Sequence, residues 1–187
     1  YEGDLLPRYE DPNGQGLGVQ APGGTIIRTD TKGSMIETVA GGLRNAYDLA
    51  FHTDGSLFVH DSDMESDLQT SWYRPTALFD VPEGGELGWR TGWAKWPEYY
   101  MDRLPNLLDT GRGSPTGATC YEHHMFPARY HQSLFLADWS EGRILNVRLK
   151  PRGGGYAAES EVFLKGQPLN VSDLEVGPDG AIYFCTG

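Results

Sequence analysis

The stretch Gly42–Asp67, GLRNAYDLAFHTDGSLFVHDSDMESD, returns later in the chain in altered form. Residues 166–186, GQPLNVSDLEVGPDGAIYFCT, repeat its order of a short apolar segment, an Asp-Gly turn and a second apolar segment. Between them lies a looser copy with a longer turn, Gly117-Ala118-Thr119-Cys120 followed by Leu134-Phe135-Leu136. The turn glycine tolerates a positive φ, so each copy predicts a β-hairpin.

The three hairpins align on residues 48, 117 and 173, at intervals of 69 and 56 residues. Further apolar segments of strand length precede the first and the last copy: Thr25–Asp30, Ile36–Ala40, Arg143–Leu149 and Glu161–Leu164. A repeated order of hairpin, strand and strand is typical of the four-stranded blade of a β-propeller. The sequence therefore predicts an all-β fold, a partial β-propeller of about three blade units. Coincidental hairpins in a β-sandwich are the alternative.

We expect residues 1–187 to form a single partial propeller domain. Residues 1–24 are rich in Gly, Pro, Asp and Asn and predict a long surface loop. An aromatic-rich excursion, residues 62–112, separates the first two hairpins, contains four of the five tryptophans and has Leu78–Val81 and Glu86–Trp89 as its candidate strands. A closed ring needs more blades than this chain supplies, because an unclosed propeller leaves bare sheet edges. We therefore expect the remaining blades to belong to a longer chain, with self-association into a full ring as the alternative.

The chain carries 26 acidic and 15 basic residues, a formal net charge of −11. This balance argues against a nucleic-acid surface, which needs clustered Lys and Arg. No apolar run approaches the roughly 20 residues of a membrane span, and no signal-peptide pattern opens the chain. The two cysteines, Cys120 and Cys185, form no C-x-x-C-H motif, so haem attachment is not encoded here. We expect buried thiols, with a disulfide between blades as the alternative.

The residues just before each inner strand of a propeller lie at the mouth of its channel. By register Asn45, Ser114 and Asn170 are equivalent, and so are Asp48 and Asp173. The pair Arg44-Asn45 is notable, because a guanidinium suits bidentate carboxylate binding and an amide both donates and accepts. We predict that it contacts a cofactor or substrate; a structural arginine that caps the preceding loop is the alternative.

Four carboxylates alternate along the segment after the first hairpin: Asp61, Asp63, Glu65 and Asp67. Carboxylates this close repel one another unless water or a hard cation such as Ca²⁺ neutralises them. They are therefore candidate calcium ligands, and a solvated acidic turn is the alternative. No Ser/His/Asp arrangement or phosphate-binding glycine loop is present, so the catalytic residues remain unassigned.

The sequence resembles the glucose/sorbosone dehydrogenase propellers, the family of soluble quinoprotein glucose dehydrogenase. The motifs that carry this resemblance run in order from about residue 23 to the end: GLRNAYDLAFHTDGSLF, HDSDMESD, GGELGW, GSPTGATCY with LFLADW, and VSDLEVGPDGAIYF. It looks closest to a branch of large secreted bacterial proteins in which the propeller precedes a c-type haem domain. That similarity rests on Pro7–Pro12, Ser62–Glu65, Trp72–Pro75 and Lys95–Tyr100.

The resemblance implies a six-bladed periplasmic or extracellular propeller that oxidises a sugar or polyol. Its cofactor would be pyrroloquinoline quinone (PQQ), held by calcium, and its general base a histidine. The resemblance implies that Arg44 and Asn45, which match the family's Arg-Asn pair, would contact the cofactor, and that His60–Asp67 would contribute to the calcium site. The family's pair of quinone-binding arginines before the last hairpin is replaced here by Asn170 and Ser172. The catalytic histidine belongs to an earlier blade outside this chain, so this segment is not expected to catalyse by itself.

Two other functions remain open. A non-catalytic propeller would bind carbohydrate or partner proteins through the Trp72–Tyr100 part of the excursion. A metal-dependent lactonase of the gluconolactonase kind, also a six-bladed propeller, would need ligands that converge on the channel. The candidates for that ligand set are Asn45, Asp48, Asn170 and Asp173.

Overall fold

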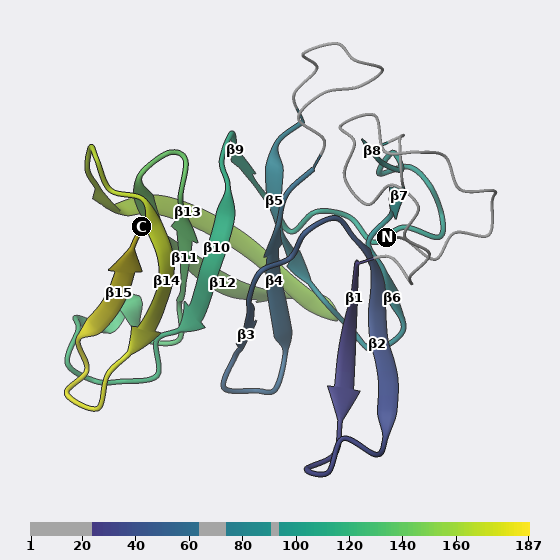
Figure 1. Cartoon of the computed structure of the whole chain (residues 1–187), viewed down its shortest axis with the longest axis horizontal. Helices are drawn as coiled ribbons and strands as arrows, with labels where there is room; N and C mark the ends of the chain where they lie inside the picture. Colours follow the sequence, from purple (N-terminus) through teal and green to yellow (C-terminus); the bar gives the residue numbers. More distant parts are fainter. Residues whose placement is uncertain (1–23, 64–73, 91–93) are drawn as a thin grey trace. The chain divides into compact units, whose positions relative to one another are not determined.

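A computed structural model describes residues 24–63, 74–90 and 94–187 of the chain (Figure 1). These residues divide into two compact units. The first contains residues 24–45, 63, 74, 81–90 and 94–105, and the second contains residues 46–62, 75–80 and 106–187. No helix within these residues is long and apolar enough to span a membrane.

The first unit is built on a three-stranded sheet of β1 (Gly24–Thr29), β2 (Ile36–Leu43) and β6 (Gly85–Glu86). β1 and β2 are antiparallel, whereas β2 and β6 are parallel. The β1–β2 turn is closed by the Asp30 carboxylate, which accepts backbone N–H groups of Lys32, Ser34 and Met35. A second, antiparallel pair joins β7 (Trp89–Arg90) and β8 (Ala94–Lys95).

The second unit contains the predicted blades. Its first sheet has the order β3 (Leu49–Phe51), β4 (Leu57–Asp61), β5 (Thr76–Asp80) and β9 (Leu108–Gly111). The next has the order β10 (Pro115–Cys120), β11 (Leu134–Asp138), β12 (Arg143–Arg152) and β13 (Gly155–Lys165). The last pairs β14 (Val171–Val176) with β15 (Ile182–Thr186), and all neighbours are antiparallel.

The three hairpins share one register. Leu49 pairs with Val59, Ala118 with Leu136 and Leu174 with Phe184, which are equivalent positions of the three copies. The first strands lie side by side, with β10 between β3 and β14 (Figure 1). The prediction that the segments at 48, 117 and 173 are neighbouring repeats is therefore confirmed.

The Asp-Gly turns behave as their sequence predicts. Gly55 and Gly180 both have positive φ, 91° and 79°. In each turn the preceding aspartate accepts the N–H of the residue after the glycine, from Ser56 to Asp54 and from Ala181 to Asp179. The middle copy replaces this turn by residues 121–133, which include a short 3₁₀ helix, Ala128–Tyr130.

The core lies between successive sheets. Ala50, Phe58 and Leu78 of the first sheet form one buried cluster with residues of the second, among them Leu134 and Leu136. A second cluster joins the second sheet to the β14–β15 pair and includes Tyr121, Phe135, Ile144, Val171 and Leu174. Antiparallel sheets stacked face to face with adjacent first strands are the blades of a β-propeller, so the predicted fold class is confirmed.

The strands of the excursion differ from expectation in two ways. β5 and β9 both come from the excursion, where they complete the first four-stranded sheet. The expected strand Glu86–Trp89 divides instead between β6 and β7, which belong to different sheets. Gly88 between them has a φ of 87°, a conformation that interrupts a strand.

Candidate functional site

A cavity of about 670 Å³ lies along the first strands of the three sheets in the second unit. Its wall is formed by β3, β10 and β14 and by the residues that follow β10 and β14. In a propeller these strands line the central channel. The volume falls within the range of roughly 300–1,000 Å³ that is typical of small-molecule sites.

The cavity wall is acidic. It carries the carboxylates of Asp48, Glu122 and Glu175, together with His123 and Thr119. His123 accepts the backbone N–H of Met125 at Nδ1, 3.2 Å away, so the proton of its neutral ring lies on Nε2. Cys120 also lines the wall, and burial, with the charge of Glu122 as a smaller cause, raises the pKa of its thiol to about 11.

Side chains at the start of the first strands link neighbouring sheets. Asp48 accepts the N–H of its neighbour Leu49 at 2.8 Å and, with its other oxygen, the N–H of Ala118 in β10 at 2.9 Å. Thr116 of β10 donates its hydroxyl to the carbonyl of Val171 in β14, 2.7 Å away. These contacts fix the spacing of the channel wall.

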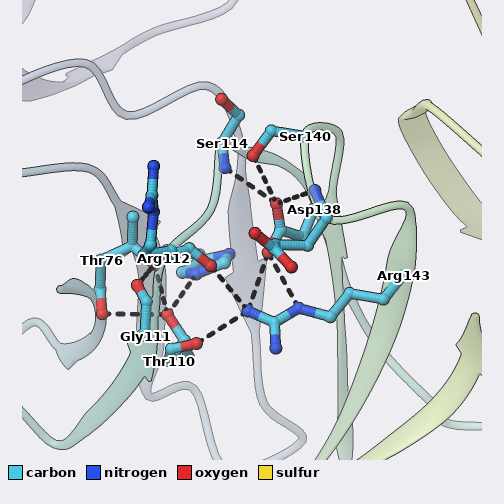
Figure 2. Close-up of polar contacts among 10 residues, drawn as sticks. Thr76, Thr110, Gly111, Arg112, Ser114, Asp138, Ser140 and Arg143 are labelled. Atoms are coloured by element: carbon cyan, nitrogen blue, oxygen red, sulfur yellow. Dashed lines mark hydrogen bonds and ion pairs between the residues drawn. The ribbon is translucent and has the colours of Figure 1, made fainter. Parts of the chain in front are cut away.

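A buried ion pair connects the first and second sheets (Figure 2). The Asp138 carboxylate, fully buried at the end of β11, lies 2.9 Å from both Nε and Nη2 of Arg143. The same Nη2 donates to the carbonyls of Thr110 and Arg112, at 2.8 and 2.9 Å. Asp138 also accepts the N–H of Ser114, which precedes β10. One aspartate–arginine pair therefore holds together the segments that enter and leave the second sheet.

This network continues into the first sheet through hydroxyl groups. Thr110 lies 2.7 Å from the hydroxyl of Thr76 and donates to the carbonyl of Thr76 at 3.0 Å. The Nε2 atom of buried His60 lies 2.9 Å from the Thr110 hydroxyl. Because the Thr110 proton goes to a carbonyl, the geometry fits a His60 tautomer that donates from Nε2. The contact with Thr110 therefore holds the His60 ring in place inside the first sheet.

The predicted cofactor pair, Arg44 and Asn45, directly follows β2 in the first unit. The Arg44 guanidinium lies over the ring of Trp89, 5.6 Å from its centroid, within the range of a cation–π interaction. Trp89 is only 2% exposed, so the aromatic platform is fixed. Asn45 is exposed.

Two of the four predicted calcium ligands lie within the described residues, and both are buried. Asp63 accepts the N–H of Lys95 at 3.3 Å and lies 3.6 Å from Nε of Arg74. Asp61 ends β4 at the position that Asp138 occupies in β11. Glu65 and Asp67 lie outside the described residues. Among the residues that are described, no group of three potential metal ligands is present.

The other predicted positions have structural partners. Asn170 donates from Nδ2 to the carbonyl of Trp139 at 2.9 Å, and Asp173 accepts the N–H of Leu174 at 2.9 Å. Both cysteines are free: Cys120 is buried as expected, whereas Cys185 is exposed on β15.

Of the aromatic excursion, Trp72 and Trp93 lie outside the described residues. Trp96 and Tyr100 pack against each other with ring centroids 5.0 Å apart. Tyr99 beside them is 84% exposed.

The blades, their first-strand cavity and their register define part of a β-propeller, and comparison with solved structures agrees. The chain is similar to a putative glucose dehydrogenase from Thermus thermophilus, with a TM-score of 0.62 and 21% identity over 95% of this chain and 46% of that one. It is similar to the PQQ-bound aldose sugar dehydrogenase of Streptomyces coelicolor, with a TM-score of 0.63 and 18% identity over 91% of this chain and 48% of that one.

The soluble aldose sugar dehydrogenase of Escherichia coli, in its apo-form, matches with a TM-score of 0.60 and 18% identity, over 83% of this chain and 45% of that one. The chain therefore spans about half the length of these proteins and shares their propeller fold. No protein-family model and no curated protein sequence matches the chain.

Sequence reasoning missed the residues that join the sheets. Asp138 and Arg143 are only five positions apart, but their partners Thr110 and Ser114 lie before β10. The signal available was the aspartate that ends the second strand in two of the three copies, Asp61 and Asp138. A buried carboxylate repeated at one register position indicates a recurring structural contact.

Proposed function

We propose that this chain is part of a propeller dehydrogenase that oxidises a sugar or polyol with PQQ as its cofactor. The observation that carries this proposal is the structural match of 82–95% of the chain to several solved sugar dehydrogenases, one of them PQQ-bound. Because propellers host many activities, the fold alone does not decide the reaction. The site residues supply the rest of the argument.

Arg44 and Asn45 are the proposed cofactor contacts. When bound, PQQ takes up the two electrons of sugar oxidation and presents carboxylates to the protein. A guanidinium pairs with a carboxylate through two parallel hydrogen bonds, and stacking over Trp89 limits the rotation of Arg44 before the cofactor arrives. The Asn45 amide offers a neighbouring donor and acceptor.

The calcium part of the proposal depends on residues beyond those described. Asp63 already has Arg74 and a backbone N–H as partners, so the described carboxylates alone do not fit a calcium site. A hard cation of this kind takes six to eight oxygen ligands, for which Glu65 and Asp67 are the remaining candidates in the acidic segment. We assign no step of the reaction to the metal.

The acidic channel cavity is the proposed sugar subsite. Carboxylate oxygens accept hydrogen bonds from sugar hydroxyls, and Glu122 and Glu175 are exposed. The resemblance to secreted proteins also leads us to propose a periplasmic or extracellular location and a haem domain elsewhere in the full protein.

The test is dye reduction by the full-length protein with PQQ, Ca²⁺ and a panel of aldoses and polyols. We expect PQQ-dependent oxidation, with a Kd for PQQ raised about tenfold or more in Arg44→Gln. Arg28→Gln is the matched control, because Arg28 pairs with Glu37 and Glu83 on the exposed surface of the same unit. Absence of both PQQ binding and sugar oxidation in the full-length protein would overturn the proposal.

A second candidate is a non-catalytic binding propeller that uses the aromatic excursion. The Trp96–Tyr100 pair and the exposed ring of Tyr99 favour it, because aromatic faces stack on sugars. It predicts sugar binding without PQQ, lost in Tyr99→Ala and retained in Tyr47→Ala, another exposed tyrosine. The lactonase candidate gains no support, because Asp48 and Asp173 accept hydrogen bonds from strand backbone.

A further inference from the structure

A second cavity, of about 450 Å³, lies in the same unit and shares no lining residue with the channel cavity. It lies where the β3–β4 turn of the first sheet meets β12, β13 and the β10–β11 connection of the second. We call it the basic cavity, because the residues that line it include Arg129, Arg148 and Lys150, with His52 and His131.

The charge of this wall opposes that of the chain. Three permanent cations face one carboxylate, that of Asp54, in a chain with a formal net charge of −11. The Asp54 carboxylate is engaged with protein groups: Tyr156 donates its hydroxyl to it, Ser56 its N–H, and His52 lies 3.0 Å away. The lining residues themselves therefore carry more permanent positive than negative charge, while the carboxylates that pair with Arg148 and Lys150 belong to Glu161 and Glu159 of β13, outside the lining.

Arg129 is the cation with the least compensation. Its Nη2 donates to the hydroxyl of Tyr130 at 2.8 Å, and its guanidinium lies over the same ring, 4.7 Å from the centroid. No carboxylate pairs with it within the described part of the chain. The Tyr130 ring thus orients a guanidinium that has no direct ion pair, with Glu161 as the one acid that attracts it from farther away.

The other two cations have exposed partners on β13. Arg148 lies 2.8 Å from Glu161 and Lys150 lies 2.9 Å from Glu159, and all four side chains are at least one-third exposed. Exposed ion pairs of this kind contribute little stability. An incoming anion can therefore take over these cations at small cost.

The uncharged lining residues suit the organic part of a ligand. Leu149, Pro151 and Tyr156 line the cavity beside the cations, and the Tyr156 ring is fixed by edge contacts with Phe58 and His52. Gln132, the one non-glycine residue with a positive φ in the described residues, also lines it. Such backbone conformations are held in place by their surroundings and recur at ligand sites.

We propose that the basic cavity binds a small phosphate monoester, with Arg129, Arg148 and Lys150 around the phosphate and the Tyr156–Leu149 side against the organic body. A phosphate monoester carries close to two negative charges at neutral pH, so three lining cations attract it. Planar guanidinium groups recognise phosphate through paired hydrogen bonds. This site is separate from the proposed dehydrogenase channel and does not depend on that function.

The test is isothermal titration calorimetry of the purified protein with ribose 5-phosphate, and with ribose as the neutral probe. We expect ribose 5-phosphate to bind and ribose not to bind, and the Kd to rise between 50 and 200 mM NaCl. Arg129→Gln and Lys150→Gln are each expected to raise the Kd about tenfold or more. Arg152→Gln, an exposed cation of β12 outside the cavity wall, is the matched control and is expected to change the Kd less than twofold.

Thermal unfolding of each variant shows whether it is folded, and two independent cation variants keep the test valid if one of them is not. Three results overturn the proposal: no heat of binding with ribose 5-phosphate at millimolar concentration, equal binding of ribose, or the same Kd in the Arg129→Gln and Arg152→Gln proteins.

Discussion

Asp48 and Ala118 join two neighbouring sheets: the Asp48 Oδ2 atom accepts the backbone N–H of Ala118 across a distance of 2.9 Å. Asp48 precedes β3, and Ala118 lies in β10, the first strand of the next sheet. The other carboxylate oxygen of Asp48 accepts the N–H of Leu49. One carboxylate therefore satisfies backbone donors in two repeats and holds their first strands at a set distance.

Loss of this carboxylate is expected to loosen the contact between the two sheets. Asp48→Ala leaves the Ala118 N–H without its acceptor, so we expect the free energy of unfolding in urea to fall by about 1–3 kcal/mol. Asp173→Ala is the control, because Asp173 accepts only the N–H of its neighbour Leu174 among the hydrogen bonds described, and we expect a smaller loss. If Asp48→Ala and Asp173→Ala lowered the free energy of unfolding equally, the contact between the sheets would add no stability beyond that of the local hydrogen bond.

The Asp138–Arg143 pair makes a sharper prediction. Arg143→Met leaves a fully buried carboxylate without its cation, so we expect a loss of about 3–5 kcal/mol in the free energy of unfolding. Arg148→Met removes a pair with Glu161 that is partly exposed on both sides, and we expect less than about 1 kcal/mol. A loss in Arg143→Met as small as that in Arg148→Met would mean that water or another cation compensates Asp138.

The Tyr156–Asp54 contact predicts a dependence of stability on pH. The hydrogen bond from Tyr156, followed by those from Ser56 and His52, holds the pKa of Asp54 well below its ordinary value of 3.8. A carboxylate with a lowered folded-state pKa stabilises the fold above its unfolded pKa, and this contribution is lost as pH falls through the folded pKa. We therefore expect Tyr156→Phe to lower Tm at pH 7 and to have a smaller effect at pH 3.

Tyr183→Phe is the matched comparison for this prediction, because Tyr183 also donates to an aspartate. The contact lies within one hairpin, and the hydrogen bond from the Ala181 N–H, followed by that from Tyr183, lowers the pKa of Asp179. We therefore expect a Tm change of the same direction with pH but a smaller one. The interpretation fails if the Tm difference between Tyr156→Phe and the parent protein is the same at both pH values.

The two thiols are expected to differ in reactivity. Burial, with Glu122 second, raises the pKa of Cys120 to about 11, whereas Cys185 is exposed. Because the thiolate is the nucleophile, a disulfide reagent at pH 8 should modify one thiol rapidly and the other slowly. The fast phase should vanish in Cys185→Ser and persist in Cys120→Ser; its loss in Cys120→Ser instead would contradict the assignment.

The repeat was readable from sequence because its signal is local. The Asp-Gly turns at 54–55 and 179–180, with apolar residues on either side, determine both the hairpins and their common register. The strand candidates Thr25–Asp30 and Ile36–Ala40 are also confirmed. They could be predicted because each lies next to a turn signal. Arg44, Asn45 and the acidic segment remain predictions, because their roles depend on a bound cofactor and metal.

What sequence reasoning missed depends on distant partners. β9 pairs with β5 across the excursion, and neither the length nor the composition of that segment indicates the pairing. The basic cavity joins His52 and Asp54 with side chains about 75–100 positions later, so no linear motif marks it. Cys185 was expected to be buried, but it lies on β15, which pairs on one side only within the described residues.

Gly117 occupies the repeat position that Asp48 and Asp173 hold in the neighbouring copies. A Cβ atom at 117 would lie 2.6 Å from Asp173 Oδ1 and 2.7 Å from the Leu174 nitrogen, so bare backbone is required there. The two junctions are therefore built differently: the Asp48 carboxylate accepts the N–H of Ala118 at the first, whereas the bare backbone of Gly117 packs against Asp173 and Leu174 at the second. A side chain at position 117 would therefore push β14 away from β10, while the strand pairing within each sheet would stay as it is.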